Sequence, residues 1–154
     1  IPLLDTSNVT HMNNMFSSCS SLKTIPQLDT SNVTNMQQMF SNCNSLISVP
    51  PLNASKVTYQ TNYGIFGYSN MDKLTDFGGL IGLKASMGSY SFDKTPNLTY
   101  ESCINVLNGL YDFTGNGVKP SGNNEGKLKV HKNFLDKVGE EISIGTNKGW
   151  TITA

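Results

Sequence analysis

Two nearly identical segments of 24 residues, 4–27 and 28–51, follow one another without a gap near the start of this 154-residue chain. Fifteen of the 24 aligned positions carry the same residue, and both copies begin with the run LDTSNVT. One copy is too short to bury its own apolar face, so copies must stack on one another to form a core. Self-similarity at such a period therefore predicts a solenoid of stacked units.

The apolar residues occupy the same positions in both copies, so stacking would turn each position into a continuous column. The columns are Leu4/Leu28, Val9/Val33, Met12/Met36, Met15/Met39, Phe16/Phe40, Leu22/Leu46 and Ile25/Val49. Segments such as NVTNM and SLKTI interleave polar and apolar residues and predict short parallel strands. The apolar stripe from Met12 to Cys19 has the spacing i, i+3, i+4, i+7, which predicts a short helical turn in each copy.

A third copy, residues 52–77, keeps apolar columns but departs from the period of 24. It has two extra residues between Val57 and Phe66, and two more between Phe66 and Leu74. Terminal copies of a repeat array are expected to be irregular because they close the core. We therefore assign residues 1–77 to the repeats.

The chain changes character after residue 77, where a Gly-Gly pair ends the periodic region. Thr99 precedes apolar residues at helical spacing and is the expected N-cap of a helix, with Glu101 in its first turn. A short strand LKV, a second helical face over 134–142 and a final strand WTIT should follow. We predict that residues 78–154 form an α/β strand–helix extension that caps the open end of the stack and protects its last strand edge.

The first two residues, Ile1-Pro2, align with Ile25-Pro26 and with Val49-Pro50 at the ends of the full copies. The sequence therefore starts at the end of a further copy. We expect upstream repeats of the same chain to be a stacking partner, with any targeting signal located before them.

The charge balance limits the classes of partner. Lysine plus arginine and aspartate plus glutamate each number 11, so the formal net charge is zero. A nucleic-acid surface or a polybasic membrane contact would need an excess of positive charge, and a membrane-spanning helix would need about 18 consecutive apolar residues, which the sequence lacks. Asn, Ser and Thr account for 49 of the 154 residues. Such a surface suits hydrogen bonding to neutral ligands such as glycans, and it suits plain solvation equally well.

The sequence contains no motif of a metal centre, nucleotide site or catalytic nucleophile. We therefore predict a protein that is not an enzyme and that needs no cofactor or metal. Asp5 and Asp29 would stack near the corners of the first two copies, and calcium binding is one interpretation of such a ladder. The third copy places Asn53 and Lys56 there, so we favour the alternative, in which these side chains bond to their own corner backbone.

The chain has three cysteines, an odd number for a disulfide-stapled scaffold. Cys19 and Cys43 hold the same repeat position, and Cys103 stands alone. We interpret all three as packed free thiols, since free cysteine behaves as a small apolar residue. A bridge between Cys19 and Cys43 stays open as an alternative, because stacked strands lie about 4.8 Å apart.

Tyr59, Tyr63 and Tyr68 cluster in the irregular third copy and are the candidate binding residues, since tyrosine is enriched at interfaces. The alternative is that they line the cap of the stack.

The pattern LDTSNVTxMxxMFSxCxSLxxxP over residues 1–77 resembles the repeat of BspA-like leucine-rich-repeat proteins of bacterial surfaces. The stretches LTYESCINVLNGLYDFTGNG and EEISIGTNKGWTI are similar to the endings of such proteins in gut Firmicutes and their phages. The resemblance implies a curved leucine-rich-repeat solenoid used for recognition outside the cell, on a bacterial surface or at a phage tail tip. It brings no catalytic residues with it.

The function predicted from the sequence is a non-enzymatic extracellular recognition or adhesion module that binds a cell-surface glycan or protein. A stack suits this role because exposed side chains can vary while the core columns stay fixed. The alternative is a structural spacer or an oligomerising segment of a surface or tail-fibre protein, whose partner would be further copies of the same chain.

Overall fold

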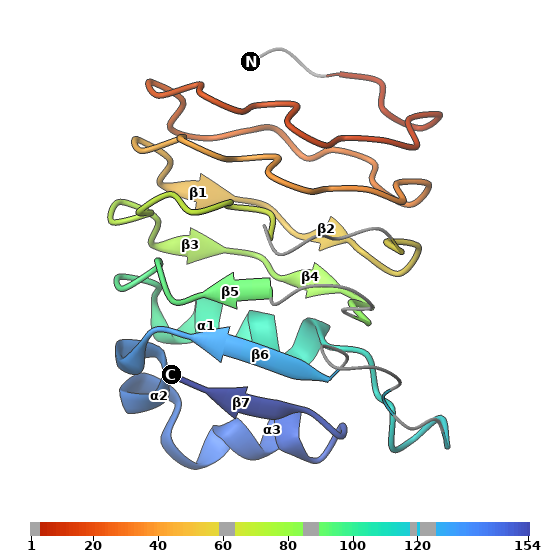
Figure 1. Ribbon diagram of the computed structural model, residues 1–154, viewed down its shortest axis with the longest axis vertical. Helices are drawn as coiled ribbons and strands as arrows, with labels where there is room; N and C mark the ends of the chain where they lie inside the picture. The colour runs from red at the N-terminus through yellow and green to blue at the C-terminus, as the bar shows by residue number, and fades with distance from the viewer. Residues whose placement is uncertain (1–3, 59–63, 85–89, 118–119, 121–125) are drawn as a thin grey trace.

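The computed structural model shows a chain that winds into a stack of similar coils, from the N-terminal residues at one end to the C-terminal helices at the other (Figure 1). The structure describes residues 4–58, 64–84, 90–117, 120 and 126–154. We call the repeat copies 4–27, 28–51 and 52–77 coils 1, 2 and 3, and residues 78–99 coil 4. No helix in the described part of the chain is long and apolar enough to cross a membrane.

One side of the stack is built from short parallel strands. β1 (Ser48–Val49) pairs with β3 (Asp76–Phe77), and β2 (Leu52–Asn53) pairs with β4 (Leu80–Ile81). A bridge between Thr24 and Ser48 carries the same pairing back to coil 1. Equivalent residues of neighbouring coils therefore lie one strand apart, as the repeat predicts.

The opposite side of coils 1 and 2 has a different backbone. Four N–H groups of coil 1 donate to four carbonyls of coil 2 at 2.7–3.0 Å: Met12 to Asn35, Asn14 to Gln37, Phe16 to Met39 and Ser18 to Ser41. All four bonds point in the same direction along the stack. Two residues in each coil, four positions apart, have positive φ: Asn14 and Ser18 in coil 1, and Gln38 and Asn42 in coil 2. Such residues let the N–H groups of every second residue point to the same side.

The prediction of a short helix over Met12–Cys19 was wrong, because two residues of this segment have positive φ, which an α-helix does not allow. Asn14 and Ser18 have φ of 59° and 64°, so the backbone forms consecutive turns whose other hydrogen bonds go to the next coil. The helical spacing nevertheless predicted which side chains share a face. In coil 2 all four of them are buried: Met36, Met39, Phe40 and Cys43.

A column of phenylalanine rings runs through the core. Phe16 and Phe40 stack with centroids 5.6 Å apart and an interplanar angle of 2°. Phe40 lies 6.2 Å from Phe66, which lies 5.8 Å from Phe92. The column thus continues past residue 77, where the sequence analysis placed the end of the periodic region.

The Gly78-Gly79 pair forms a corner of the stack. Gly78 N–H donates to the carbonyl of Val49 at 2.9 Å, and the carbonyl of Gly79 accepts from Leu52 N–H at 3.1 Å. A Cβ on Gly78 would lie 2.3 Å from the backbone nitrogen of Pro51, so only glycine fits there. The pair lets the start of coil 4 pack closely against Pro51 and Leu52, where coil 2 leads into coil 3.

The C-terminal half continues the same winding, with helices on one side in place of strands. β5 (Tyr90–Phe92), β6 (Lys127–Val130) and β7 (Thr151–Thr153) form a parallel sheet in that order. Their arrows run opposite to those of β1–β4 in Figure 1. α1 (Tyr100–Gly109) connects β5 to β6 and packs against β3 and β4. α2 (Lys132–Val138), η1 (Gly139–Ile142) and α3 (Ser143–Thr146) connect β6 to β7.

The expected start of α1 is confirmed. Thr99 Oγ1 accepts from the N–H of Ser102 at 3.2 Å, and Glu101 lies in the first turn. The helical face predicted over 134–142 is interrupted at Gly139, whose φ of 51° ends α2. His131 caps α2 by accepting from the N–H of Asn133 at 3.1 Å, a role the sequence analysis missed.

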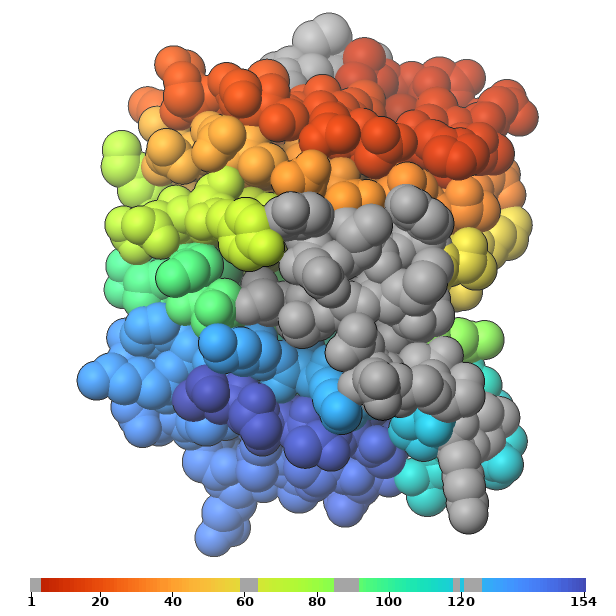
Figure 2. Space-filling view, in the orientation of Figure 1, coloured from red at the N-terminus to blue at the C-terminus, as the bar shows by residue number. Residues whose placement is uncertain are grey.

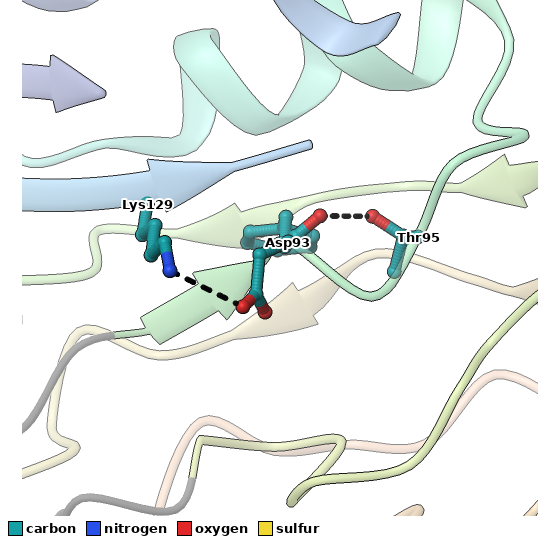
Figure 3. A network of polar contacts seen from close by, with 4 residues as sticks. Asp93, Thr95 and Lys129 are labelled. Atoms are coloured by element: carbon teal, nitrogen blue, oxygen red, sulfur yellow. Dashed lines mark hydrogen bonds and ion pairs between the residues drawn. The ribbon is translucent and has the colours of Figure 1, made fainter. Parts of the chain in front are cut away.

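Polar contacts hold the turn after β5, at the end of coil 4, against the neighbouring strand β6 (Figure 3). Lys129 on β6 forms an ion pair with Asp93 at 3.5 Å. The buried Thr95 hydroxyl donates to the carbonyl of Phe92 at 2.8 Å and closes the turn after β5. These contacts lie within the C-terminal half, whereas the two halves are joined by backbone bonds such as Met71 N–H to the Lys94 carbonyl, by the packing of Phe66 on Phe92, and by the bond from Asn97 Nδ2 to the Asp72 carbonyl.

Candidate functional site

The residues that follow each phenylalanine of the column form one edge of the stack, which we call the turn edge. It comprises residues 17–21 in coil 1, 41–45 in coil 2, 67–73 in coil 3 and 93–97 in coil 4. Three of these segments have five residues, whereas the one in coil 3 has seven. The turn edge is the series of loops stacked on the left of Figure 1.

The regular junction between coils 1 and 2 is closed. Ser18 N–H donates to the backbone carbonyl of Ser41 at 2.7 Å, and the thiol of Cys43 donates to the carbonyl of Phe16 at 3.0 Å. Two edges of equal length therefore stack in register with backbone polar groups paired.

The junction between coils 2 and 3 is different because of the two extra residues. Asn42, at the same repeat position as Ser18, donates its N–H to the side-chain oxygen of Ser69 at 2.5 Å. Ser69 Oγ also lies 3.4 Å from Asn42 Oδ1. Ser69 and Met71 are both buried, and Met71 N–H donates to the carbonyl of Lys94 at 2.8 Å. The insertion is thus anchored at these two residues.

A surface groove of about 430 Å³ opens at this junction. We call it the insertion groove and define it by its lining residues: Asn42, Asn44, Tyr68, Ser69, Asn70, Asp72 and Lys73. The yellow-green residues of coil 3 lie at the left rim of the space-filling view, next to the orange residues of coil 2 (Figure 2). Its volume lies within the range of about 300–1,000 Å³ that small-molecule sites occupy.

The lining of the groove is polar and carries no excess of charge. Within the described ranges, the side chains of Asn44, Asn70 and Lys73 and the carboxylate of Asp72 form no hydrogen bond or ion pair. The backbone beneath them is held, since Asn97 Nδ2 donates to the carbonyl of Asp72 at 2.7 Å. These four side chains therefore offer donors and acceptors to a ligand from a backbone that is held at Asp72.

Only one of the three candidate tyrosines can be placed at this site. Tyr68 lines the groove with 70 % of its surface exposed. Tyr59 and Tyr63 lie outside the described residues. The sequence analysis missed the three asparagines, Asp72 and Lys73, although the two-residue insertion that assembles them was visible in the sequence.

The aspartates near the corners bond to their own backbone, as the favoured interpretation predicted. Asp5 Oδ1 accepts from the hydroxyl and the N–H of Ser7 at 2.7 and 3.1 Å, and these bonds lower the pKa of Asp5. Asp29 Oδ1 accepts from the N–H of Ser31 at 2.9 Å, which lowers the pKa of Asp29 in the same way. Within the described parts of the chain, no group of three or more His, Cys, Asp or Glu side chains is placed to hold a metal ion.

The cysteines differ from one another in exposure. All three are free thiols; Cys43 and Cys103 are buried, and Cys19 is exposed. The prediction that all three are packed was therefore wrong for Cys19. Cys43 lies in coil 2, between coils 1 and 3, whereas Cys19 lies in coil 1, the first coil of the described residues. Burial raises the pKa of Cys43, and it raises the pKa of Cys103 to about 11.

Comparison with known proteins finds a match for one part of the chain. No curated protein and no solved structure matches the sequence. The N-terminal part does match a family, over a stretch that includes coils 1 and 2, most of coil 3 and every residue of the insertion groove. Residues 1–73 match the family described as "Mycoplasma protein of unknown function, DUF285".

Proposed function

We propose that this chain is a non-enzymatic leucine-rich-repeat recognition module that works outside the cell, on a bacterial surface or a phage tail. Its ligand is a cell-surface glycan or protein, bound at the turn edge of the stack. The family that matches residues 1–73 is associated with BspA-like surface repeat proteins, and the proposal of a surface role follows from that association.

The insertion groove is the observation that carries this proposal. Exposed polar side chains around a groove with an anchored backbone make a binding site whose backbone needs little reorganisation. Asn44 and Asp72 come from different coils, so the site depends on stacking. A ligand that contacts both residues would bind at the lengthened edge of coil 3 and not at the regular junction between coils 1 and 2.

A structural spacer or oligomerising segment is the alternative. The unbroken phenylalanine column favours it, since continuous stacking would give a stiff rod. The two functions make opposite predictions about the groove. A spacer needs none of its polar side chains, whereas a recognition module loses binding when they are removed.

The test is cell binding by the fluorescently labelled chain, measured by flow cytometry on a panel of Gram-positive bacteria and cultured epithelial cells. Saturable binding should fall at least tenfold in the double variant Asn44→Ala/Asp72→Ala. The matched control is Ser20→Ala, which changes the same repeat position as Asn44 in coil 1, outside the groove. Absence of binding to every cell type, together with concentration-dependent association in sedimentation velocity, would replace recognition by the oligomerising alternative.

A further inference from the structure

We propose that the insertion groove binds a neutral pyranose residue of a glycan, with the ring face of Tyr68 as its platform. This inference rests on the proposed recognition function and names the ligand class of the same site. Three features of the groove lead to it: its charge balance, the kinds of polar group it holds, and the exposure of Tyr68.

The charge balance favours a neutral ligand. Asp72 and Lys73 are the charged residues of the lining, and they have opposite signs; the other five lining residues are uncharged. An anionic sugar or a phosphate would meet the carboxylate of Asp72 together with the ammonium of Lys73. A cationic ligand would meet the same pair, so neither gains net attraction.

The polar groups match hydroxyls, which both donate and accept hydrogen bonds. The amides of Asn44 and Asn70 each offer a donor and an acceptor, Asp72 offers acceptors, and Lys73 offers donors. Vicinal hydroxyls of a pyranose need such a mixture within a short distance. A purely acceptor or purely donor surface would leave half of their capacity unused.

Tyr68 supplies the apolar component. A pyranose has a face of C–H groups, and an aromatic ring carries negative charge on its face, which attracts the positive hydrogens of such a surface. With 70 % of its surface exposed, Tyr68 can cover this face while the hydroxyls at the ring edge reach the amides. Its neighbour Ser69 is buried and bonded to Asn42, so the backbone that carries Tyr68 is fixed.

The experiment is titration of the ¹⁵N-labelled chain with methyl α-mannopyranoside, methyl β-galactopyranoside and N-acetylglucosamine, followed by NMR. Glucuronic acid and glycerol serve as the charged and the acyclic probes. We expect saturable shifts of the side-chain amides of Asn44 and Asn70 with at least one neutral pyranose. Affinity should fall at least tenfold in Tyr68→Ala and stay within about threefold in Tyr68→Phe, because the platform is the ring and not the hydroxyl.

The controls separate this proposal from the broader one. Ser20→Ala should bind like the parent, and unchanged melting temperatures of the Tyr68 variants would show that the fold is intact. Tighter binding of glucuronic acid than of every neutral sugar would overturn the neutral-ligand inference. If no sugar shifts the amides while Asn44→Ala/Asp72→Ala still abolishes cell binding, the pyranose proposal is wrong and recognition stands. If cell binding is also absent or unaffected by that variant, the proposed function fails as well.

Discussion

The junction between coils 1 and 2 and the junction between coils 2 and 3 share one core and differ at the turn edge. At the first junction Ser18 N–H meets a backbone carbonyl, that of Ser41, at 2.7 Å. At the second, Asn42 at the same repeat position meets the side chain of Ser69 at 2.5 Å, and a groove of about 430 Å³ opens beside it. The two extra residues of coil 3 account for the difference.

The comparison shows that core and edge of the stack vary independently. The ring centroids of the phenylalanine column are 5.6 Å apart across the first junction and 6.2 Å apart across the second, so the column crosses both without a gap. The two extra residues of coil 3 leave this column in place; its lengthened edge is largely exposed, and Met71 joins the buried core. A repeat array can thus acquire a binding site by lengthening one edge while its core stays unchanged.

Truncation of the shared column should have the greatest effect on stability. Phe40 is fully buried and has a ring on each side, so Phe40→Ala should lower the free energy of unfolding by about 3–5 kcal/mol. Phe16→Ala should cost less, since among the described residues the ring of Phe16 has one ring neighbour, Phe40, where Phe40 has two. Urea denaturation measures both variants. Equal losses would mean that the second ring contact contributes nothing.

Loss of Met71, which anchors the lengthened edge of coil 3, should have the second largest effect on stability. Met71 is 1 % exposed, and Met71→Ala should cost about 2–5 kcal/mol through the cavity that it leaves. The same variant should weaken ligand binding at the groove, because the edge of coil 3 would no longer be held. Met71→Leu is the matched control and should keep most of both properties. Full binding by Met71→Ala would show that the groove does not depend on the anchor.

Replacement of Ser69 should have a smaller effect. Ser69→Ala removes the acceptor of Asn42 N–H, and we expect a loss of about 1 kcal/mol, the usual net worth of one hydrogen bond. Ser69→Cys places the residue of coil 2 at this position and should lie between the parent and Ser69→Ala, since sulfur is a weak acceptor. Thermal unfolding in parallel samples measures the order. If the Ser69→Ala variant is as stable as the parent, Met71 alone anchors the lengthened edge of coil 3.

The sequence predicted the stacking columns well because they follow from burial. The alignment of Phe16 and Phe40 with Phe66 is confirmed by the ring contacts, and the N-cap at Thr99 is confirmed by its bond to Ser102. The bonding of Asp5 and Asp29 to the corner backbone is confirmed too. The N-cap and the corner bonds span two or three residues, and the ring contacts follow from the repeat, which puts equivalent residues of neighbouring coils together.

The parts that failed depend on backbone conformation or on contacts between coils. The residue spacing over Met12–Cys19 fits both a helix and a run of turns, because both bring the same side chains to one face. The positive φ of Asn14 shows that this segment forms turns. The helix break at Gly139 depends on φ in the same way. The insertion groove is formed by residues about 25–30 positions apart, so only the difference in edge length pointed to it.

The thiols at one repeat position offer the finest test of the comparison, one that leaves stability unchanged. Cys19 and Cys43 share the sequence context Met-Phe-Ser-x-Cys-x-Ser-Leu, yet Cys19 is exposed and Cys43 is buried. Burial raises the pKa of Cys43, so its reactive thiolate is scarce as well as covered. With N-ethylmaleimide at pH 7, followed by mass spectrometry, Cys19 should react first. Cys43 should react more than about 100-fold more slowly, since a local opening of about 3 kcal/mol reduces the accessible population by that factor.

The pH dependence of the Cys43 rate is a second readout of its burial. Cys43 should stay slow until the pH exceeds the ordinary thiol value of 9.0, because burial raises its pKa in the folded chain. Cys103, with a pKa of about 11, serves as the buried control on the helical side of the stack. Met71→Ala should accelerate Cys43 and leave Cys103 unchanged, since only the coil 3 edge that covers Cys43 is loosened. Equal reactivity of Cys19 and Cys43 in the intact chain would mean that coil 3 does not cover coil 2 at the turn edge, and the distinction between a closed and an open junction would have to be abandoned.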